Sequence, residues 1–287
     1  MEVVKRWFSA DSITTKYVHR TTDNYFIEAS YINRKEKHII CVSTQVGCIV
    51  GCRFCVSGVR GKKRFKRGLT YNEIVEQCLH IIKDINFEAE KKPLLISLMG
   101  EGEPFLNFTQ CLKALNELFS LNWSVPIRFS ISTSGIRPDL IKRLGEKGSN
   151  LPLKLQISLH GPTDSVRQQL IPFTKPLAEI LEAAREYEKS GGRIDWNYVM
   201  CEGVNDHIEN ADILCKILPP GAHVKFNRLN TFNGLRFEKV SYEKVQYFRK
   251  LLEMQGYSTE YYETDGSDIN ATCGQLSYSF QEALLEK

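Results

Sequence analysis

The chain is predicted to form an α/β fold, a partial (open) parallel α/β barrel with antiparallel strands at its N-terminus and a further strand and loop at its C-terminus. From residue 38 onward, short apolar segments alternate with longer amphipathic ones. This is the pattern of strands buried on both faces and connected by helices. The 287 residues, 42% hydrophobic and 25% charged, are typical of a globular protein and sufficient for one core domain of this size.

Six segments have the apolar, β-branched composition of buried strands; they are residues 38–44, 94–100, 128–133, 153–158, 194–200 and 223–229. Helical periodicity lies between them, at residues 71–86, 109–120, 138–147, 176–189, 207–218 and 241–255. Thr70 and Glu73 form a capping box at the start of the first helix. Residues 1–37 are expected to be an N-terminal β extension with antiparallel strands at 14–19 and 24–32. Residues 38–287 are expected to be the core domain, which ends in a strand at 258–263 and a loop containing Cys273.

Charge and hydropathy point to a cytoplasmic protein. The formal net charge of +4 permits a nucleic-acid partner without requiring one. The N-terminus has no apolar signal-peptide region, and no apolar segment is long enough to span a membrane.

Three of the nine cysteines, Cys48, Cys52 and Cys55, lie close together directly after the first barrel strand. Zinc would require a fourth ligand and a second CxxC or HxxxH pair, which is absent, whereas three thiolates suit a 4Fe-4S cluster with one open iron. Coincidental clustering of buried thiols is the weaker explanation. Cys41, seven residues before Cys48, could be a fourth ligand, an inert core residue or a residue with its own chemistry. Four further cysteines stand singly in apolar segments and are interpreted as small buried hydrophobic residues; they are Cys78, Cys111, Cys201 and Cys215.

The spacing CxxxCxxC, with Phe54 before the last cysteine, resembles the signature of radical S-adenosylmethionine (AdoMet) enzymes. The resemblance implies a radical SAM type of barrel and one 4Fe-4S cluster whose open iron binds AdoMet. An electron from a donor such as flavodoxin or ferredoxin then releases a 5′-deoxyadenosyl radical. By itself the triplet indicates the superfamily and not the substrate.

Seven stretches, the first of which contains the triplet, extend the resemblance over nearly the whole chain: CVSTQVGCIVGCRFC, GEGEPFLN, ISTSGIRP, ISLHGPTDSVRQQLIPF, YVMCEGVND, NTFNG and DINATCGQL. In this order they are similar to the RlmN/Cfr family, which methylates an sp2 carbon of adenine in RNA. The resemblance implies an enzyme that uses two AdoMet molecules per turnover and acts on rRNA or tRNA.

The same resemblance gives roles to two cysteines outside the triplet. Cys273 would take a methyl group from a first AdoMet, and the radical from a second AdoMet would abstract hydrogen from that S-methyl group. The carbon radical would then add to adenine and link RNA to protein. Cys41 would form a disulfide with Cys273 and release the methylated base, which makes it a resolving thiol. Glu28 would hold the target adenine and assist proton movement.

Residues at the carboxyl ends of the predicted strands match the AdoMet positions of the family. They are Gly102, Glu103, Ser134, Ser158, Leu159, His160 and Asn230. A basic segment at 60–68 follows the cysteine triplet and suits phosphate contact. Its candidate RNA contacts are Arg60, Lys62, Lys63, Arg64, Lys66 and Arg67.

The sequence departs from the family in three places. The family's N-terminal helical accessory domain has no room before Cys41, so we expect it to be missing. Either the substrate is then a smaller RNA such as tRNA, or a helper RNA-binding protein supplies the missing RNA contacts. Glu101 replaces the methionine of GMGEP, and NTFNG replaces NPFPG. Both carbon 2 and carbon 8 of adenine stay open, with QVGC and GEGEP favouring carbon 2. The alternatives are a radical SAM methylase of a substrate other than RNA and a non-catalytic metal-binding protein.

Overall fold

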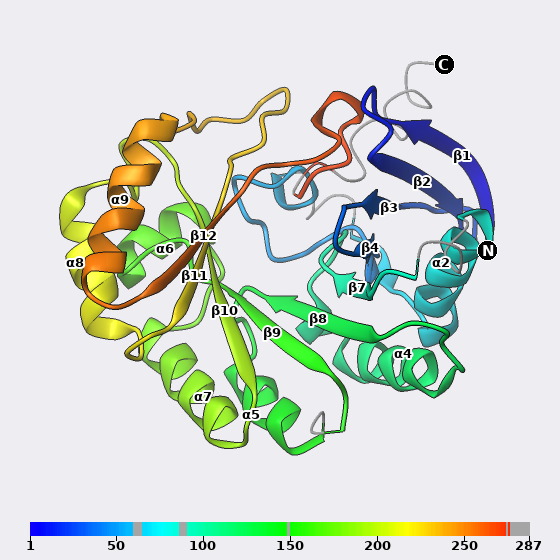
Figure 1. Ribbon diagram of the computed structural model, residues 1–287, viewed down its shortest axis with the longest axis horizontal. Helices are drawn as coiled ribbons and strands as arrows, with labels where there is room; N and C mark the ends of the chain where they lie inside the picture. The colour runs from blue at the N-terminus through cyan, green and yellow to red at the C-terminus, as the bar shows by residue number, and fades with distance from the viewer. Residues whose placement is uncertain (60–64, 86–90, 148–149, 274, 276–287) are drawn as a thin grey trace.

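A computed structural model describes residues 1–59, 65–85, 91–147, 150–273 and 275. Its central feature is a curved ten-stranded sheet with the strand order β1-β2-β3-β4-β7-β8-β9-β10-β11-β12 (Figure 1). The two edge strands, β1 and β12, are not paired with each other, so the sheet is an open barrel. This confirms the predicted α/β fold with a partial parallel barrel.

The parallel part of the sheet contains all six predicted barrel strands and the predicted C-terminal strand. Each pairs in parallel with the next. Their bounds are β4 His38–Cys41, β7 Leu94–Leu98, β8 Ile127–Thr133, β9 Leu153–Ser158, β10 Arg193–Val199, β11 His223–Asn227 and β12 Ser258–Tyr262. The first strand is shorter than predicted because the chain leaves the sheet after Cys41 and pairs again as β5 (Gln45–Val46) with β6 (Arg67–Gly68).

Helices cover the outer side of the curved sheet (Figure 1). Their bounds are α2 Tyr71–Asp84, α4 Phe108–Ser120, α5 Pro138–Lys147, α6 Asp164–Leu170, α7 Leu177–Lys189, α8 Ile208–Ile217 and α9 Tyr242–Met254, with 3-10 turns η1 Pro104–Leu106 and η2 Ser267–Ile269. The predicted capping box of Thr70 and Glu73 is present at α2. The sequence did not predict α6, a short polar helix.

The N-terminal extension has three antiparallel strands rather than the two predicted: β1 Glu2–Phe8, β2 Thr14–Arg20 and β3 Phe26–Asn33. β3 pairs antiparallel with β4, so the extension continues the barrel sheet. β1 was missed because it is an edge strand whose side chains are mostly exposed. Such a strand lacks the apolar character by which buried strands are recognised.

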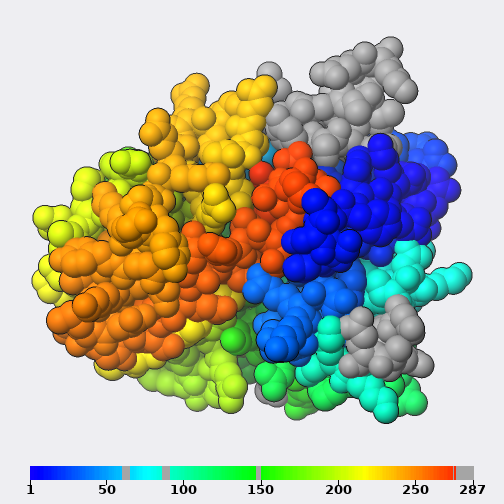
Figure 2. All heavy atoms as spheres, turned by 45° about the horizontal axis from the view of Figure 1, so that its top comes forward, coloured from blue at the N-terminus to red at the C-terminus, as the bar shows by residue number. Residues whose placement is uncertain are grey.

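The C-terminal segment after β12 lies against the N-terminal strands (Figure 2). The Asp265 carboxylate accepts hydrogen bonds from the Arg34 guanidinium, one of them 2.9 Å from Nε. Asp268 accepts a hydrogen bond from the backbone amide of Ala10 at 2.8 Å. These contacts join residues more than two hundred positions apart and bring the loop that contains Cys273 to the barrel.

His19 in β2 is fully buried and stacks on His80, with ring centroids 5.5 Å apart. Neither ring nitrogen of His19 has a hydrogen-bond partner among the described residues. Burial lowers its pKa to about 3. The unfolded chain binds this proton below a pH of about 6.5, whereas the folded chain binds it only below a pH of about 3, so stability falls as the pH drops between these values.

We therefore expect the free energy of unfolding to fall by about 3 kcal/mol between pH 7 and pH 4 because of His19. His19→Phe, which keeps an aromatic ring without the titration, should lose less stability over this range than the unmodified chain. Urea unfolding at pH 7, 5 and 4 measures the difference, with His207→Phe at an exposed position as the control. An unchanged pH dependence in His19→Phe would contradict this assignment.

No helix among the described residues is long and apolar enough to cross a membrane.

Candidate active site

A pocket of about 150 Å3 lies at the carboxyl ends of the parallel strands. This is the end of an α/β barrel where catalytic side chains gather. Ten residues singled out from the sequence line it: Cys48, Cys52, Cys55, Gly102, Glu103, Ser134, Ser158, His160, Asn230 and Cys273. Cys41, Glu28 and Leu159 do not line this pocket, although each is connected to it as described below.

The loop of the cysteine triplet is tightly folded. A Cβ atom on Gly58 would lie 2.2 Å from the carbonyl oxygen of Cys52, so only glycine fits beside the turn. The Arg53 amide is hydrogen-bonded to the Leu170 carbonyl at 2.8 Å, which attaches the loop to the end of α6. Burial raises the pKa of all three thiols, and the negative charge of Cys48 and Cys55 raises that of Cys52 further.

The donor set of this loop fits a 4Fe-4S cluster. Three thiols face one pocket, and bound irons would remove the electrostatic cost of ionising them side by side. Among the described residues, no three Cys, His, Asp or Glu side chains are placed to hold a single metal ion. A single ion requires ligands that converge on one point, whereas in a cubane cluster each thiolate binds a different iron.

Glu103 connects two strands at the pocket. Its carboxylate accepts hydrogen bonds from the backbone amide and the hydroxyl of Ser134, both at 2.8 Å, and from the Phe105 amide at 3.1 Å. Burial nevertheless raises its pKa, because no cationic side chain among the described residues forms an ion pair with it. A buried carboxylate of this kind favours a cationic ligand, and the ammonium group of AdoMet is such a ligand. Gly102 has a φ of +108°, and a Cβ there would collide with the side chain of Gln45 at 2.7 Å.

His160 is neutral and oriented by the backbone. Its Nδ1 accepts a hydrogen bond from the Val199 amide at 3.0 Å, which leaves the proton on Nε2. Burial lowers its pKa to about 3. The ring edge meets Phe54 of the cysteine loop, with centroids 4.8 Å apart. His160 can therefore donate a hydrogen bond to a ligand without carrying charge.

Arg167 of α6 was missed by sequence reasoning. Its side chain is fully buried and donates hydrogen bonds to the carbonyl oxygens of Ser134 at 2.9 Å and Ser158 at 3.0 Å, and also to that of Leu159. It has no ion-pair partner among the described residues, and burial lowers its pKa to about 10. One guanidinium thus holds together the ends of two strands that carry AdoMet candidates. Leu159 takes part through its backbone carbonyl, which accepts one of these hydrogen bonds.

Cys273 lines the pocket, and hydrogen bonds to its backbone and from a neighbouring residue hold its loop in place. Asn230 donates a hydrogen bond to the Cys273 carbonyl at 3.0 Å, and Gln275 donates one to the Thr231 carbonyl at 2.7 Å. The residue is exposed toward the pocket, but the surrounding protein desolvates the thiol and raises its pKa, an effect that the charge of Lys225 opposes.

Met99 links the Cys273 thiol to the Cys41 thiol. Its sulfur lies 3.7 Å from Cys273 Sγ, and its backbone amide is hydrogen-bonded to Cys41. The pKa of Cys41 is raised by burial and by the nearby Cys273. The two thiols that the family resemblance pairs are therefore close enough for the charge of Cys273 to raise the pKa of Cys41.

Glu28 and Cys41 lie on the same face of the sheet. Ser30 in β3 pairs with Cys41 in β4, and residues two apart on a strand share a face. Glu28 is 2% exposed and forms an ion pair with Lys16 at 3.3 Å. Lys16 is fully buried, and its ammonium lies 4.6 Å from the Trp7 ring and 3.5 Å from the Asn270 carbonyl. This ion pair, which sequence reasoning missed, joins Glu28 to the loop that contains Cys273.

Most of the predicted RNA contacts fall in a segment outside the described residues. Arg60, Lys62, Lys63 and Arg64 lie outside the described residues. Lys66 is exposed. Arg67 instead forms ion pairs with Asp23 at 2.7 Å and Glu73 at 2.8 Å, so its guanidinium would have to give up these partners to bind a phosphate.

Comparison with known proteins identifies the family of the chain. Residues 42–212 match the model of the Radical SAM superfamily. The chain is 40% identical over 271 residues to a protein of Symbiobacterium thermophilum named "Probable dual-specificity RNA methyltransferase RlmN", covering 92% of this chain and 71% of that protein. It is 37% identical to the "Dual-specificity RNA methyltransferase RlmN" of Syntrophus aciditrophicus, covering 96% and 78%.

A solved structure of a radical SAM methyltransferase has the same fold. The crystal structure of a radical SAM methyltransferase from Sphaerobacter thermophilus superimposes with a TM-score of 0.88 at 32% identity, covering 96% of this chain and 81% of that one. The fold and the sequence relatives therefore agree, and this chain belongs to the RlmN family of radical SAM RNA methyltransferases.

Proposed function

We propose that this chain methylates an sp2 carbon of adenine in rRNA or tRNA, with carbon 2 preferred, through a methyl-cysteine intermediate and a transient protein–RNA adduct. The observation that carries the proposal is the position of Cys273. Cys273 lines the same pocket as the cysteine triplet and the AdoMet candidates, and Met99 contacts both Cys273 and Cys41. The names of the relatives supply the RNA substrate.

In this proposal a first AdoMet methylates the Cys273 thiol, and a second AdoMet is consumed in activating that methyl group. When bound, the 4Fe-4S cluster would supply the electron that cleaves the second AdoMet. Glu103 and Ser134 would orient the methionyl end of AdoMet, and His160 would donate a hydrogen bond from Nε2. Cys41 would then attack the sulfur of Cys273, so that the sulfur–sulfur bond forms as the sulfur–carbon bond breaks. The electron pair of the broken bond would go to the carbon attached to adenine, which would take up a proton and become the methyl group. External reductant would restore both thiols.

Glu28 would hold the adenine, and Lys16 would hold the Glu28 side chain in place through their ion pair at 3.3 Å. We also propose an electron donor such as flavodoxin or ferredoxin, and a helper RNA-binding protein as partner.

The test of the first half-reaction does not need RNA. Anaerobic incubation with AdoMet carrying a deuterated methyl group should add one labelled methyl group to the peptide containing Cys273, as read by mass spectrometry. Cys273→Ala should acquire no label, whereas Cys215→Ala, which removes a thiol outside the pocket, should be labelled as the unmodified chain is. An unlabelled Cys273 in a protein that still cleaves AdoMet would contradict the proposal.

The second half-reaction identifies the substrate. Total tRNA and rRNA from cells lacking this activity, incubated with the reconstituted enzyme, should yield 2-methyladenosine on digestion. Methylated Cys273 without any methylated adenosine would retain the cysteine chemistry and remove RNA as the substrate.

A further inference from the structure

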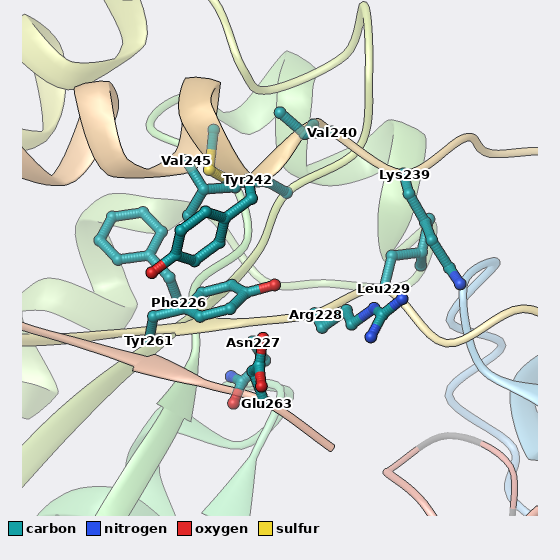
Figure 3. A pocket seen from close by; sticks show the side chains of 11 residues that line it. Phe226, Asn227, Arg228, Leu229, Lys239, Val240, Tyr242, Val245, Tyr261 and Glu263 are labelled. Carbon is teal, nitrogen blue, oxygen red and sulfur yellow. The ribbon is translucent and has the colours of Figure 1, made fainter. Parts of the chain in front are cut away.

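A second pocket, of about 210 Å3, lies beside the active-site pocket and has no role in the chemistry described above (Figure 3). Its walls come from the end of β11, from the segment before α9, from α9 and from β12. Both pockets share Asn227, Arg228 and Leu229, the residues that follow the buried part of β11. Any molecule in the second pocket is therefore separated from the reacting groups by a single stretch of chain.

Two cations lie on one side of this pocket. Figure 3 shows Arg228 and Lys239 together, across the pocket from the ring of Tyr242. Neither side chain forms an ion pair or hydrogen bond among the described residues. The charge of Arg228 and burial together lower the pKa of Lys239, so the two positive charges are close enough to repel each other. An anion bound between them would remove this repulsion.

Two tyrosine rings form another wall. Tyr242 and Tyr261 meet edge to face, with centroids 5.4 Å apart. Tyr242 is 54% exposed, so much of its ring surface is available to a ligand. Glu263 and Asn227 lie below the rings in Figure 3 and offer oxygen acceptors for the amino groups of a base. The volume is below the roughly 300–1,000 Å3 of pockets for drug-sized ligands, and it suits one planar ring system.

The pocket therefore combines what a nucleotide requires: a pair of cations for its phosphate and an aromatic surface for its base. The position of the pocket indicates which nucleotide of the RNA would bind there. Because the pocket adjoins the active site, a nucleotide within it would be a neighbour of the adenine that reacts. A purely apolar ligand would leave the cations unpaired, and a free phosphate would leave the tyrosine rings uncovered.

We infer that this second pocket binds a nucleotide of the RNA strand that flanks the target adenine, with its phosphate at Arg228 and Lys239 and its base against Tyr242. The inference rests on the proposed function, since it takes RNA as the substrate. It adds a subsite that grips single-stranded RNA within the barrel domain itself.

The test is direct binding of fluorescein-labelled hexa-adenylate RNA to the reconstituted holoenzyme, followed by fluorescence anisotropy over a range of salt concentrations. Tyr242→Leu should weaken binding by about 5- to 100-fold with an unchanged salt dependence. Tyr247→Leu is its matched control, because Tyr247 is 52% exposed on the same helix but lies outside the pocket.

Arg228→Ala and Lys239→Ala should each weaken binding and lower the slope of log K against log salt, by about 1 if the phosphate contact is lost. Lys250→Ala, exposed on α9, is the control for loss of charge.

A hexanucleotide of abasic residues separates base stacking from phosphate contact. Tyr242→Leu should bind it as tightly as the unmodified chain, whereas Arg228→Ala should still bind it more weakly. Equal affinities of the pocket variants and their controls for hexa-adenylate would overturn the inference. The proposed function is tested by separate measurements, which are the methylation of Cys273 and of RNA by the unmodified chain. Its failure would leave the binding result interpretable, because hexa-adenylate binding does not depend on turnover.

Discussion

Cys41→Ala is expected to abolish multiple turnover and to accumulate RNA covalently attached to Cys273. The reason lies in the arrangement of the two thiols, because Met99 contacts both of them and the charge of Cys273 raises the pKa of Cys41. Without Cys41, no thiol in this position can form the disulfide that releases the RNA. Denaturing electrophoresis of the reaction with labelled RNA should show a protein-sized RNA band, and nuclease digestion followed by peptide mass spectrometry should locate the adduct on Cys273.

Cys111→Ala provides the matched control for this experiment. Cys111 is a fully buried thiol in α4 that does not line the pocket, so its loss removes packing and not chemistry. We expect this variant to release methylated RNA without a persistent adduct. Release of methylated RNA by Cys41→Ala at the rate of the unmodified chain would mean that another group resolves the adduct.

Arg167→Met is expected to lower the free energy of unfolding by about 3–5 kcal/mol and to weaken AdoMet binding. Three buried carbonyl oxygens, on Ser134, Ser158 and Leu159, would lose their donor, and each unsatisfied buried group costs about 1–3 kcal/mol before relaxation. The strand ends that these carbonyls belong to would no longer be held at the pocket. Urea unfolding of the cluster-free protein gives the stability, and equilibrium dialysis of the reconstituted protein gives the affinity for AdoMet.

Two further substitutions make the result for Arg167 specific. Arg167→Lys should recover only part of both losses, because an ammonium lacks the planar fork that reaches several carbonyls at once. Arg185→Met, at an exposed position on α7, should change stability by no more than about 0.5 kcal/mol. A stable Arg167→Met variant with normal AdoMet affinity would show that the strand ends do not depend on this side chain.

The barrel was predictable because its strands are buried on both faces, which favours runs of apolar residues such as that of β7. Helix α2 was predictable for a related reason, since Thr70 and Glu73 mark its start and its apolar side chains recur along one face. Both features are local in the sequence. The pocket residues came from motifs, and the structure brings ten of them to one pocket.

What was not predictable depends on contacts between distant residues. Helix α6 buries little besides Arg167 and Leu170, so its sequence shows no apolar stripe. The function of Arg167 depends on carbonyl groups of residues up to 33 positions away. The Lys16–Glu28 ion pair likewise depends on the pairing of β2 with β3, and an isolated lysine in an N-terminal segment gives no indication of it.

The docking of the last described segment on the first strands has a consequence for biosynthesis. Asn270 contacts Lys16 and Asp265 contacts Arg34, so this part of the molecule cannot assemble until residues 265–270 have left the ribosome. Contacts over such separations form late, because their loop entropy must be overcome first. The nascent chain therefore presents its cysteine triplet in an uncovered barrel before Cys273 arrives. We expect cluster insertion to precede this closure, which would make the methyl-accepting thiol the last part of the site to be completed.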